Sequence, residues 1–220
     1  MRIGIVGGTG KLGTGLAARW TRTGHEVLIG SRDVGKARAH VEELALQGQG
    51  PMEAADYAGA ARGADVVVLA VPYEAHGQAL EAICEAMAGK ILVDVTVPLK
   101  PPKVSRVYLP PGQSAALEAQ ALLGAGTPVV AALHHVSATH LADVGHAIEC
   151  DVLVASDDER AKEAVMQLVG DLGLRALDAG ALVNAIALES LTPVLIHLNR
   201  VYKSQGAGVV LTNLPSRSPR

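Results

Sequence analysis

Three glycines near the start of the chain have a spacing that could hold a dinucleotide. The run Gly8-x-Gly10-x-x-Gly13 follows a strand pattern over residues 2–6 and opens a helical pattern over residues 11–23. In this place the spacing is typical of a dinucleotide-binding turn. We expect Gly8 to permit the tight turn, Gly10 to let the backbone approach a pyrophosphate, and Gly13 to let the helix pack closely on the strand. The alternative is a plain strand-to-helix connection.

The end of the second predicted strand indicates which dinucleotide would bind. An NAD-binding chain usually has an acidic residue there, bonded to the ribose 2′-hydroxyl. Here the strand over residues 26–30 is followed by Ser31 and Arg32, and Lys36 lies about one helical turn further on. A hydroxyl and two cations suit a 2′-phosphate, so NADP is favoured over NAD. Asp33 fits best at the start of the next helix, and a solvated Ser-Arg turn is the alternative.

Three later segments should meet at one edge of the sheet. Val71-Pro72-Tyr73 follows the fourth predicted strand, Val97-Pro98-Leu99 follows the fifth, and residues 134–138 follow the sixth. Ligands of an open α/β sheet bind beyond the carboxyl ends of its strands. Most of these residues are apolar or small, so the cleft suits a flat nicotinamide ring better than a cluster of acids and bases.

Histidines gather in one window but do not have the spacing of a metal site. His134, His135, His140 and His146 are four of the eight histidines, yet they form no i, i+4 pair with a carboxylate and no cysteine is near. We therefore expect no metal. His134 or His135 could donate a hydrogen bond to a bound ring, and either could equally be a structural histidine.

The apolar segments alternate between strand and helix patterns along the chain. Continuous apolar strands of this kind are typical of a parallel sheet covered by helices on both faces. The sequence thus predicts an α/β, doubly wound, mainly parallel sheet with a small C-terminal helical part.

Residues 98–112 contain five prolines and should form a long surface loop, a common place for a ligand-facing segment. Strands are expected at residues 2–6, 26–30, near Met52, and at 65–71, 91–95, 129–133, 151–155 and 174–177. Helices are expected at residues 11–23, at 34–47, after the acidic start Ser156-Asp157-Asp158-Glu159, and at 182–202 with a kink at Pro193.

Composition excludes several classes of protein. The 220 residues are 49% hydrophobic and 19% charged, which is an ordinary globular balance. A net charge of -3 and 2% aromatic residues offer neither a basic patch nor a base-stacking platform, so we expect no nucleic acid. Cys84 and Cys150 are read as reduced, buried thiols. We find no signal peptide pattern and no stretch apolar enough to span a bilayer, and we expect a cytoplasmic protein whose final residues, 216–220, are frayed.

These motifs together resemble one enzyme family over nearly the whole chain. The glycine turn is shared with many dinucleotide folds, whereas the later motifs are much narrower. The chain is identified as similar to the NADPH-dependent deazaflavin reductases, also called NADP oxidoreductases of coenzyme F420. The resemblance is carried by residues 7–13, Gly24-His25-Glu26-Val27, Gly30-Ser31-Arg32, Ala70-Val71-Pro72, Ala132-Leu133-His134, Asp157-Asp158-Glu159, Leu177-Asp178-Ala179-Gly180 and Glu189-Ser190-Leu191-Thr192-Pro193.

The resemblance implies a reaction, an architecture and a set of contacts. The reaction is reversible hydride transfer between NADP(H) and the deazaflavin ring of coenzyme F420. The architecture is a Rossmann domain over residues 1–150 with a smaller part over residues 151–220 that closes the cleft, usually as a homodimer. On this resemblance the pyrophosphate would contact Thr9, Gly10, Lys11 and Leu12, the 2′-phosphate would contact Ser31, Arg32 and Lys36, and the nicotinamide half would lie near Tyr73, Val97 and Ala138.

The sequence departs from the family pattern in three places. The double histidine His134-His135 is not a fixed feature of the family, and Tyr73 stands where some members have a larger aromatic residue. Residues 209–211 and the tail after them match poorly, which makes the deazaflavin the least secure part of the resemblance.

Ring-to-ring hydride transfer needs positioning and exclusion of water more than acid–base groups. We therefore expect His134→Ala and His135→Ala each to leave turnover intact. Two other functions remain open from the residues. One is an NADPH-dependent reductase of a small imine, keto acid or ferric chelate, which often carries a larger helical domain. The other is a non-catalytic NADPH-binding sensor.

Overall fold

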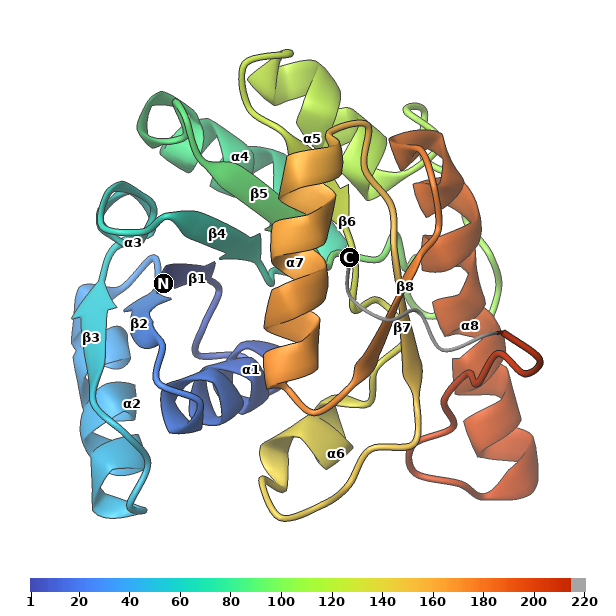
Figure 1. Ribbon diagram of the computed structural model, residues 1–220, viewed down its shortest axis with the longest axis horizontal. Helices are drawn as coiled ribbons and strands as arrows, with labels where there is room; N and C mark the ends of the chain where they lie inside the picture. The colour runs from blue at the N-terminus through green and yellow to red at the C-terminus, as the bar shows by residue number, and fades with distance from the viewer. Residues whose placement is uncertain (215–220) are drawn as a thin grey trace.

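The computed structural model describes residues 1–214 (Figure 1), so the expectation for residues 216–220 lies outside the described residues. Six strands form a parallel sheet in the order β3-β2-β1-β4-β5-β6. The order reverses at β1 and β4, as in a doubly wound Rossmann sheet, so the predicted fold class is confirmed. The bounds are β1 Arg2–Val6, β2 Glu26–Gly30, β3 Met52–Ala55, β4 Val66–Leu69, β5 Ile91–Asp94 and β6 Val129–Ala131.

Both faces of the sheet are buried, as its continuous apolar strands require. In β4, Val66 and Val68 belong to one core cluster while Val67 and Leu69 belong to the other. The first cluster packs against α1 and α7, and the second against α3, α4 and α5. Because successive strand residues point to opposite faces, an unbroken apolar run places side chains in both cores.

The helices fall into predicted and unpredicted sets. α1 (Lys11–Arg22) and α2 (Val34–Leu46) confirm the two early helical patterns. Four helices of five to nine residues were not assigned from the sequence, because so few residues show too little of a helical period. They are α3 Tyr57–Arg62, α4 His76–Ile83, α5 Ala115–Leu123 and α6 Ala138–Ala142. The loop expected over residues 98–112 contains neither helix nor strand.

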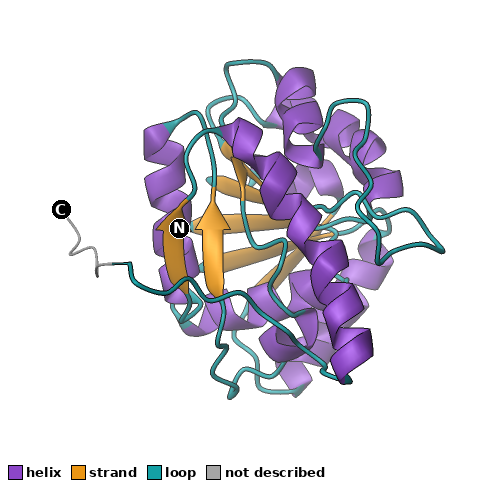
Figure 2. Cartoon of the chain, turned by 90° about the vertical axis from the view of Figure 1, so that its right-hand side faces the viewer, coloured by secondary structure: helices purple, strands orange, loops and turns teal. Residues whose placement is uncertain are grey.

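The next two strands form a sheet of their own. β7 (Asp151–Val154) and β8 (Arg175–Asp178) pair in parallel, with α7 (Glu159–Asp171) between them. Figure 2 shows this pair in front of the main sheet. Backbone hydrogen bonds of 2.9 and 3.0 Å between Ala131 and Ala155 join the pair to the end of β6. The acidic start signal is confirmed, because Asp158 caps α7 by accepting a hydrogen bond from the Ala161 amide.

The last helix corrects the sequence-based expectation about membrane spans. A short 3₁₀ turn leads into α8 (Ala185–Tyr202), which continues through Pro193. Residues 182–202 are long and apolar enough to cross a membrane by length and composition, so the expectation that no stretch would qualify was wrong. Core helices of soluble proteins pass the same test, and α8 packs against α5 while 33% of its apolar window is buried. One face of α8 therefore remains apolar and exposed.

The two cysteines differ in their surroundings. Cys150 is buried as expected, whereas Cys84 is exposed, so the expectation of a buried Cys84 was wrong. The preceding residue, Ile83, is fully buried at the end of α4. Adjacent helical residues point in different directions, so burying Ile83 turns Cys84 toward solvent.

Candidate functional site

The glycine turn leaves a helix end open for an anion. Gly10 caps α1 without a side chain, and a Cβ there would meet only the Gly7 carbonyl oxygen, at 3.3 Å. A Cβ on Gly13 would lie 2.7 Å from the Gly8 Cα, so the expected close packing is present. The first amides of a helix have no partner within the helix. Those of Lys11 and Leu12 are therefore placed to bind a phosphate group.

The tight turn depends on a different glycine from the one expected. Gly7 has a positive φ of 85°, and its amide donates to the Gly30 carbonyl at 3.0 Å. Gly8 does not have a positive φ, but a Cβ there would lie 2.9 Å from the Ile5 carbonyl oxygen. Gly7 thus supplies the conformation of the turn, and Gly8 supplies the space.

The residues after β2 present two cations to solvent. Ser31 is buried, and its Oγ accepts a hydrogen bond from the Asp33 amide at 3.2 Å. Asp33 in turn caps α2 by accepting from the Lys36 amide, as the sequence indicated. Arg32 and Lys36 are exposed, and no carboxylate of residues 1–214 lies within ion-pair distance of either. These two charges are available to a ligand.

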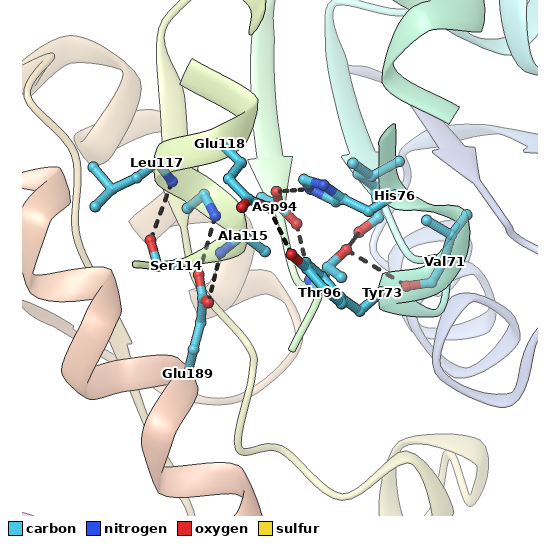
Figure 3. Close-up of polar contacts among 12 residues, drawn as sticks. Val71, Tyr73, His76, Asp94, Thr96, Ser114, Ala115, Leu117, Glu118 and Glu189 are labelled. Carbon is cyan, nitrogen blue, oxygen red and sulfur yellow. Dashed lines mark hydrogen bonds and ion pairs between the residues drawn. The ribbon is translucent and has the colours of Figure 1, made fainter. Parts of the chain in front are cut away.

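The ends of β4 and β5 meet through a buried polar network (Figure 3). Asp94, at the end of β5, is fully buried and accepts hydrogen bonds from His76 Nε2 at 2.7 Å and from the Thr96 amide at 2.9 Å. The Thr96 hydroxyl reaches the Val71 carbonyl at 3.5 Å. Burial opposes the charged imidazole, but the hydrogen bond and charge of Asp94 raise the pKa of His76 overall. The network thus links Val71, after β4, to Thr96, the residue before the half-buried Val97.

Tyr73 is attached to α5 instead of pointing freely into the cleft. Its hydroxyl donates to Glu118 of α5 at 2.9 Å, and its ring stacks on His76 with centroids 6.0 Å apart. Burial and the hydrogen bond to Glu118 raise the pKa of Tyr73, so it stays a neutral phenol. These contacts hold the Tyr73 side chain in place just after β4.

Glu189 brings a buried carboxylate from α8 to the amino terminus of α5 (Figure 3). It is 3% exposed, and its oxygens accept hydrogen bonds from the Ala115 amide at 2.8 Å and the Ala116 amide at 3.1 Å. Burial raises the pKa of Glu189 to about 8, although both amide bonds favour the charged form. This contact ties the last helix to the main sheet layer.

The raised pKa makes stability depend on pH. Ionisation of Glu189 opposes folding, so we expect the free energy of unfolding to fall as pH rises from the ordinary pKa of 4.5 through about 8. A tenfold change in the ionisation constant corresponds to about 1.4 kcal/mol. Glu189→Gln cannot ionise and should flatten this dependence in urea unfolding at a series of pH values. Exposed Glu163→Gln is the control, and parallel curves for wild type and Glu189→Gln would contradict the expectation.

The two adjacent histidines, which the sequence did not distinguish, have different surroundings in the structure. His135 donates from Nε2 to the Asp151 carbonyl at 2.8 Å and is structural. His134 is 5% exposed and has no hydrogen-bond partner for either ring nitrogen within the described chain. Burial lowers the pKa of His134 to about 4, so its imidazole is neutral near pH 7. Its ring lines a pocket of about 140 Å³ with Thr192, whose hydroxyl donates to the His134 carbonyl at 2.8 Å.

Of the other two histidines of the window, His140 lies in α6 and His146 lies in the loop after it. The rings of His140 and His146 are 4.3 Å apart, and residues 1–214 contain no group of three or more side chains that could hold a metal ion. Ala138 begins α6, which packs on α1, where a Cβ on Gly15 would lie 2.8 Å from the Leu141 side chain. Ala138 therefore begins a helix that is held against α1.

Comparison with known proteins decides the family. Residues 2–98 match the family described as NADP oxidoreductase, coenzyme F420-dependent. Over 225 residues the chain is 40% identical to the F420-dependent NADP reductase of Methanothermobacter thermautotrophicus, covering 99% of this chain and 97% of that protein.

The chain belongs to the coenzyme F420-dependent NADP oxidoreductase family. The resemblance inferred from the motifs is confirmed.

Solved structures similar to this chain include a protein described as a member of this family and proteins that share its fold alone. A protein from Arthrobacter sp. FB24, assigned as an F420-dependent NADP reductase, superimposes with a TM-score of 0.81 and 30% identity over 95% of this chain and 99% of that one. The Streptomyces aurantiacus imine reductase has a TM-score of 0.60 and 20% identity, and 92% of this chain covers 62% of that one. The second likeness shows the fold alone.

Sequence reasoning missed the buried polar network at the ends of β4 and β5. Asp94 was the one detectable signal, because an acidic residue ends an otherwise apolar strand pattern. Such a carboxylate needs a buried partner, and His76 provides it. The contacts of Glu118 and Glu189 gave no signal, since their partners lie far away in the sequence.

Proposed function

We propose that this oxidoreductase transfers hydride between NADP(H) and coenzyme F420 at the carboxyl edge of the main sheet. The observation that carries the choice of NADP(H) is the pair of exposed cations, Arg32 after β2 and Lys36 in the first turn of α2, neither of which has an ion-pair partner among residues 1–214. With buried Ser31 they would hold the 2′-phosphate. The open amino terminus of α1, with Thr9, Gly10, Lys11 and Leu12, would hold the pyrophosphate.

The nicotinamide would lie between the ends of β4, β5 and β6. Buried Val71, half-buried Tyr73 and Val97, and Ala138 at the start of α6 would form its walls. The adjacent pocket beside Thr192 would take an edge of the deazaflavin, to which a ring nitrogen of His134 without a partner would bond. An orphaned buried nitrogen is costly, so a ligand group that pairs with it contributes binding energy.

The chain's own residues would act by positioning. When bound, the nicotinamide and the deazaflavin supply the hydride chemistry between them. The walls would hold the two rings against each other and exclude water. Neutral His134 and neutral Tyr73 add no charge beside the rings. No nucleophile or obligatory general base is required of the protein.

The proposal is tested by mixing the purified protein with NADPH and oxidised coenzyme F420 and following the visible deazaflavin band. Bleaching that requires NADPH and fails with NADH is the expected result. Tight NADPH binding without bleaching would contradict it. That result would favour the two rival functions, a reductase of a small imine, keto acid or ferric chelate, or an NADPH-binding sensor.

Removal of the His134 ring should affect binding more than chemistry. We expect His134→Ala to keep kcat within about tenfold and to raise the KM for coenzyme F420, because the ring bonds to the deazaflavin without transferring a proton. Stopped-flow single-turnover rates and steady-state KM values test this. His135→Ala is the matched control for loss of a buried ring. A fall in the single-turnover rate by several orders of magnitude would reveal an acid–base step.

A second copy of the chain is the partner that fits the exposed face of α8. Apolar residues recur there every three or four positions, as in a helix–helix seam. Val194, Val201 and Tyr202 are exposed, and Ala187, Leu191 and Leu198 continue the stripe. Dimerisation through this face would also account for an apolar helix with little burial. Sedimentation of wild type and Val194→Glu distinguishes a dimer from a monomer.

The remaining expectations are proposals of the same kind. Residues 1–150 would bind the dinucleotide, and residues 151–220 would close the cleft, in a cytoplasmic enzyme without nucleic-acid or membrane partners. Glu189 supports the closing role, because it anchors α8 to α5 across the proposed boundary.

A further inference from the structure

Arg19 binds five backbone carbonyl groups with one half-buried guanidinium. Its Nε, Nη1 and Nη2 donate, over distances between 2.7 and 3.4 Å, to the carbonyl oxygens of His140, Leu141, Asp143, His146 and Leu172. No carboxylate of residues 1–214 lies within ion-pair distance of Arg19. Its hydrogen bonds therefore hold backbone segments in place and neutralise no acidic partner.

These carbonyls lie at the ends of two helices. His140 and Leu141 belong to the last turn of α6, and Asp143 caps that helix. Leu172 caps α7. The last four carbonyls of a helix have no partner within the helix, and a cation there also meets the negative end of the helix dipole. Arg19, in α1, thus caps α6 and α7 together and fastens both to α1, and these three helices meet in Figure 1.

The capped helix α6 follows directly after the proposed ring site. Residues 134–137 line the pocket beside α8, and Ala138, a proposed wall of the nicotinamide site, is the first residue of α6. Five residues are too few for a helix that is stable alone. The position of α6 therefore depends on α1, through Arg19 and through the close approach of Gly15 to Leu141.

The same helix, α1, carries the proposed pyrophosphate site at its other end. The amides of Lys11 and Leu12 open the helix, and Arg19 lies about two helical turns further along. The contact at Arg19 therefore sets where α6 lies relative to the phosphate groups of a bound dinucleotide. Hydride transfer is sensitive to such placement, because the reacting atoms must be held at near-attack distance.

We propose that Arg19 is a positioning residue for hydride transfer, which holds α6 against α1 and so places the walls of the ring site relative to the bound dinucleotide. The inference rests on the proposed function, because the walls matter only where two rings meet. Arg19 touches neither substrate and acts through the backbone of α6.

The test compares Arg19→Ala with wild type in the single-turnover reduction of coenzyme F420 by bound NADPH. We expect the transfer rate to fall about 10- to 100-fold, since a displacement of about 1 Å can have an effect of this size. The dissociation constant of NADPH should not change, because its proposed phosphate contacts remain. Guanidinium chloride, at a concentration well below that which unfolds the variant, should restore part of the rate. Methylammonium chloride should not, because it lacks the planar fork of donors.

Lys90→Ala is the matched control for loss of a cation that binds carbonyl groups. Lys90 Nζ donates to the carbonyls of Arg62, at the end of α3, and of Ala64. It precedes β5 and so lies at the amino edge of the sheet, away from the proposed site. Its loss should lower the free energy of unfolding and leave the transfer rate unchanged. If Arg19 only stabilised the fold, Arg19→Ala would behave in the same way.

Arg19→Lys keeps the charge but has all its donors on one nitrogen. It should show a smaller fall in rate in the same direction, and it replaces Arg19→Ala in the comparison if that variant does not fold. A wild-type transfer rate in either Arg19 variant overturns the proposal while the proposed function stands.

Hydrogen exchange gives a second readout that does not require activity. The amides of residues 138–146 should exchange faster in Arg19→Ala than in wild type, and at the wild-type rate in Lys90→Ala. Unchanged exchange in Arg19→Ala would overturn the proposed hold on α6. Failure of the wild type to reduce coenzyme F420 would overturn the proposed function and the positioning role with it, whereas exchange would still show whether Arg19 holds α6.

Discussion

Arg32→Ala is expected to raise the KM for NADPH about 10- to 100-fold and to leave the KM for NADH unchanged. A hydrogen bond to a charged group contributes about 1.5–3 kcal/mol, and Arg32 has no competing carboxylate in the described chain. The contact is the same in the ground state and the transition state, so kcat should not change. Steady-state kinetics with both dinucleotides measure the effect.

Arg38→Ala is the matched control for this variant. Arg38 is also an exposed arginine on α2, two residues beyond Lys36, which turns it to another side of the helix. Its loss should change the KM for NADPH little. Equal effects of the two variants would mean that α2 attracts NADPH only by general charge. No effect of Arg32→Ala would remove Arg32 from the 2′-phosphate site.

Gly7→Ala should disturb the proposed nucleotide site more than a methyl group added at any other glycine of the turn. A residue with a side chain is strained at the φ of 85° by about 1–2 kcal/mol. The added Cβ would also overlap the Ala70 carbonyl oxygen and lie 2.8 Å from the Val71 side chain. Overpacking adds about 1–3 kcal/mol. We expect a loss of about 2–5 kcal/mol in the free energy of unfolding and at least about a 100-fold loss of NADPH affinity, because the turn must move.

Gly24→Ala separates strain from displacement of the turn. Gly24 has nearly the same φ, 87°, and a methyl group added there would have nothing within 4 Å. Its substitution should cost only the strain, about 1–2 kcal/mol, and leave NADPH affinity unchanged. Urea unfolding and NADPH titration measure both variants. Similar losses of stability in the two variants, with NADPH binding intact in Gly7→Ala, would show that the turn tolerates the overlap.

Long apolar strands and amphipathic helices were predictable because their patterns are local. β1 and β2 lie at the predicted residues, and α1 and α2 end within one residue of the prediction. Short helices were not predictable. The five-residue α6, for example, is stabilised more by its packing on α1 than by its own sequence. The exposure of Cys84 and the apolar outer face of α8 were also decided by packing.

The dinucleotide half of the proposed site could be suggested from the sequence in the same way. A glycine turn and the two residues after β2 would act through their own backbone and charge, so their spacing is enough to suggest them. The sequence did not show which glycine adopts the positive φ. That choice depends on how closely the residue after β1 approaches the Ala70 carbonyl after β4. The structural role of His135 and the unpartnered ring of His134 depended on residues far along the chain.

By itself the sequence determined the parallel α/β architecture, the NADP-type turn and the family, because each is written in contiguous residues. Only the tertiary structure decided which buried contacts lie beside the second half of the proposed site. Asp94 pairs with His76, Glu118 with Tyr73, and Glu189 with the first amides of α5. Buried carboxylates are stable only where donors meet them, and chain folding alone brings those donors within reach.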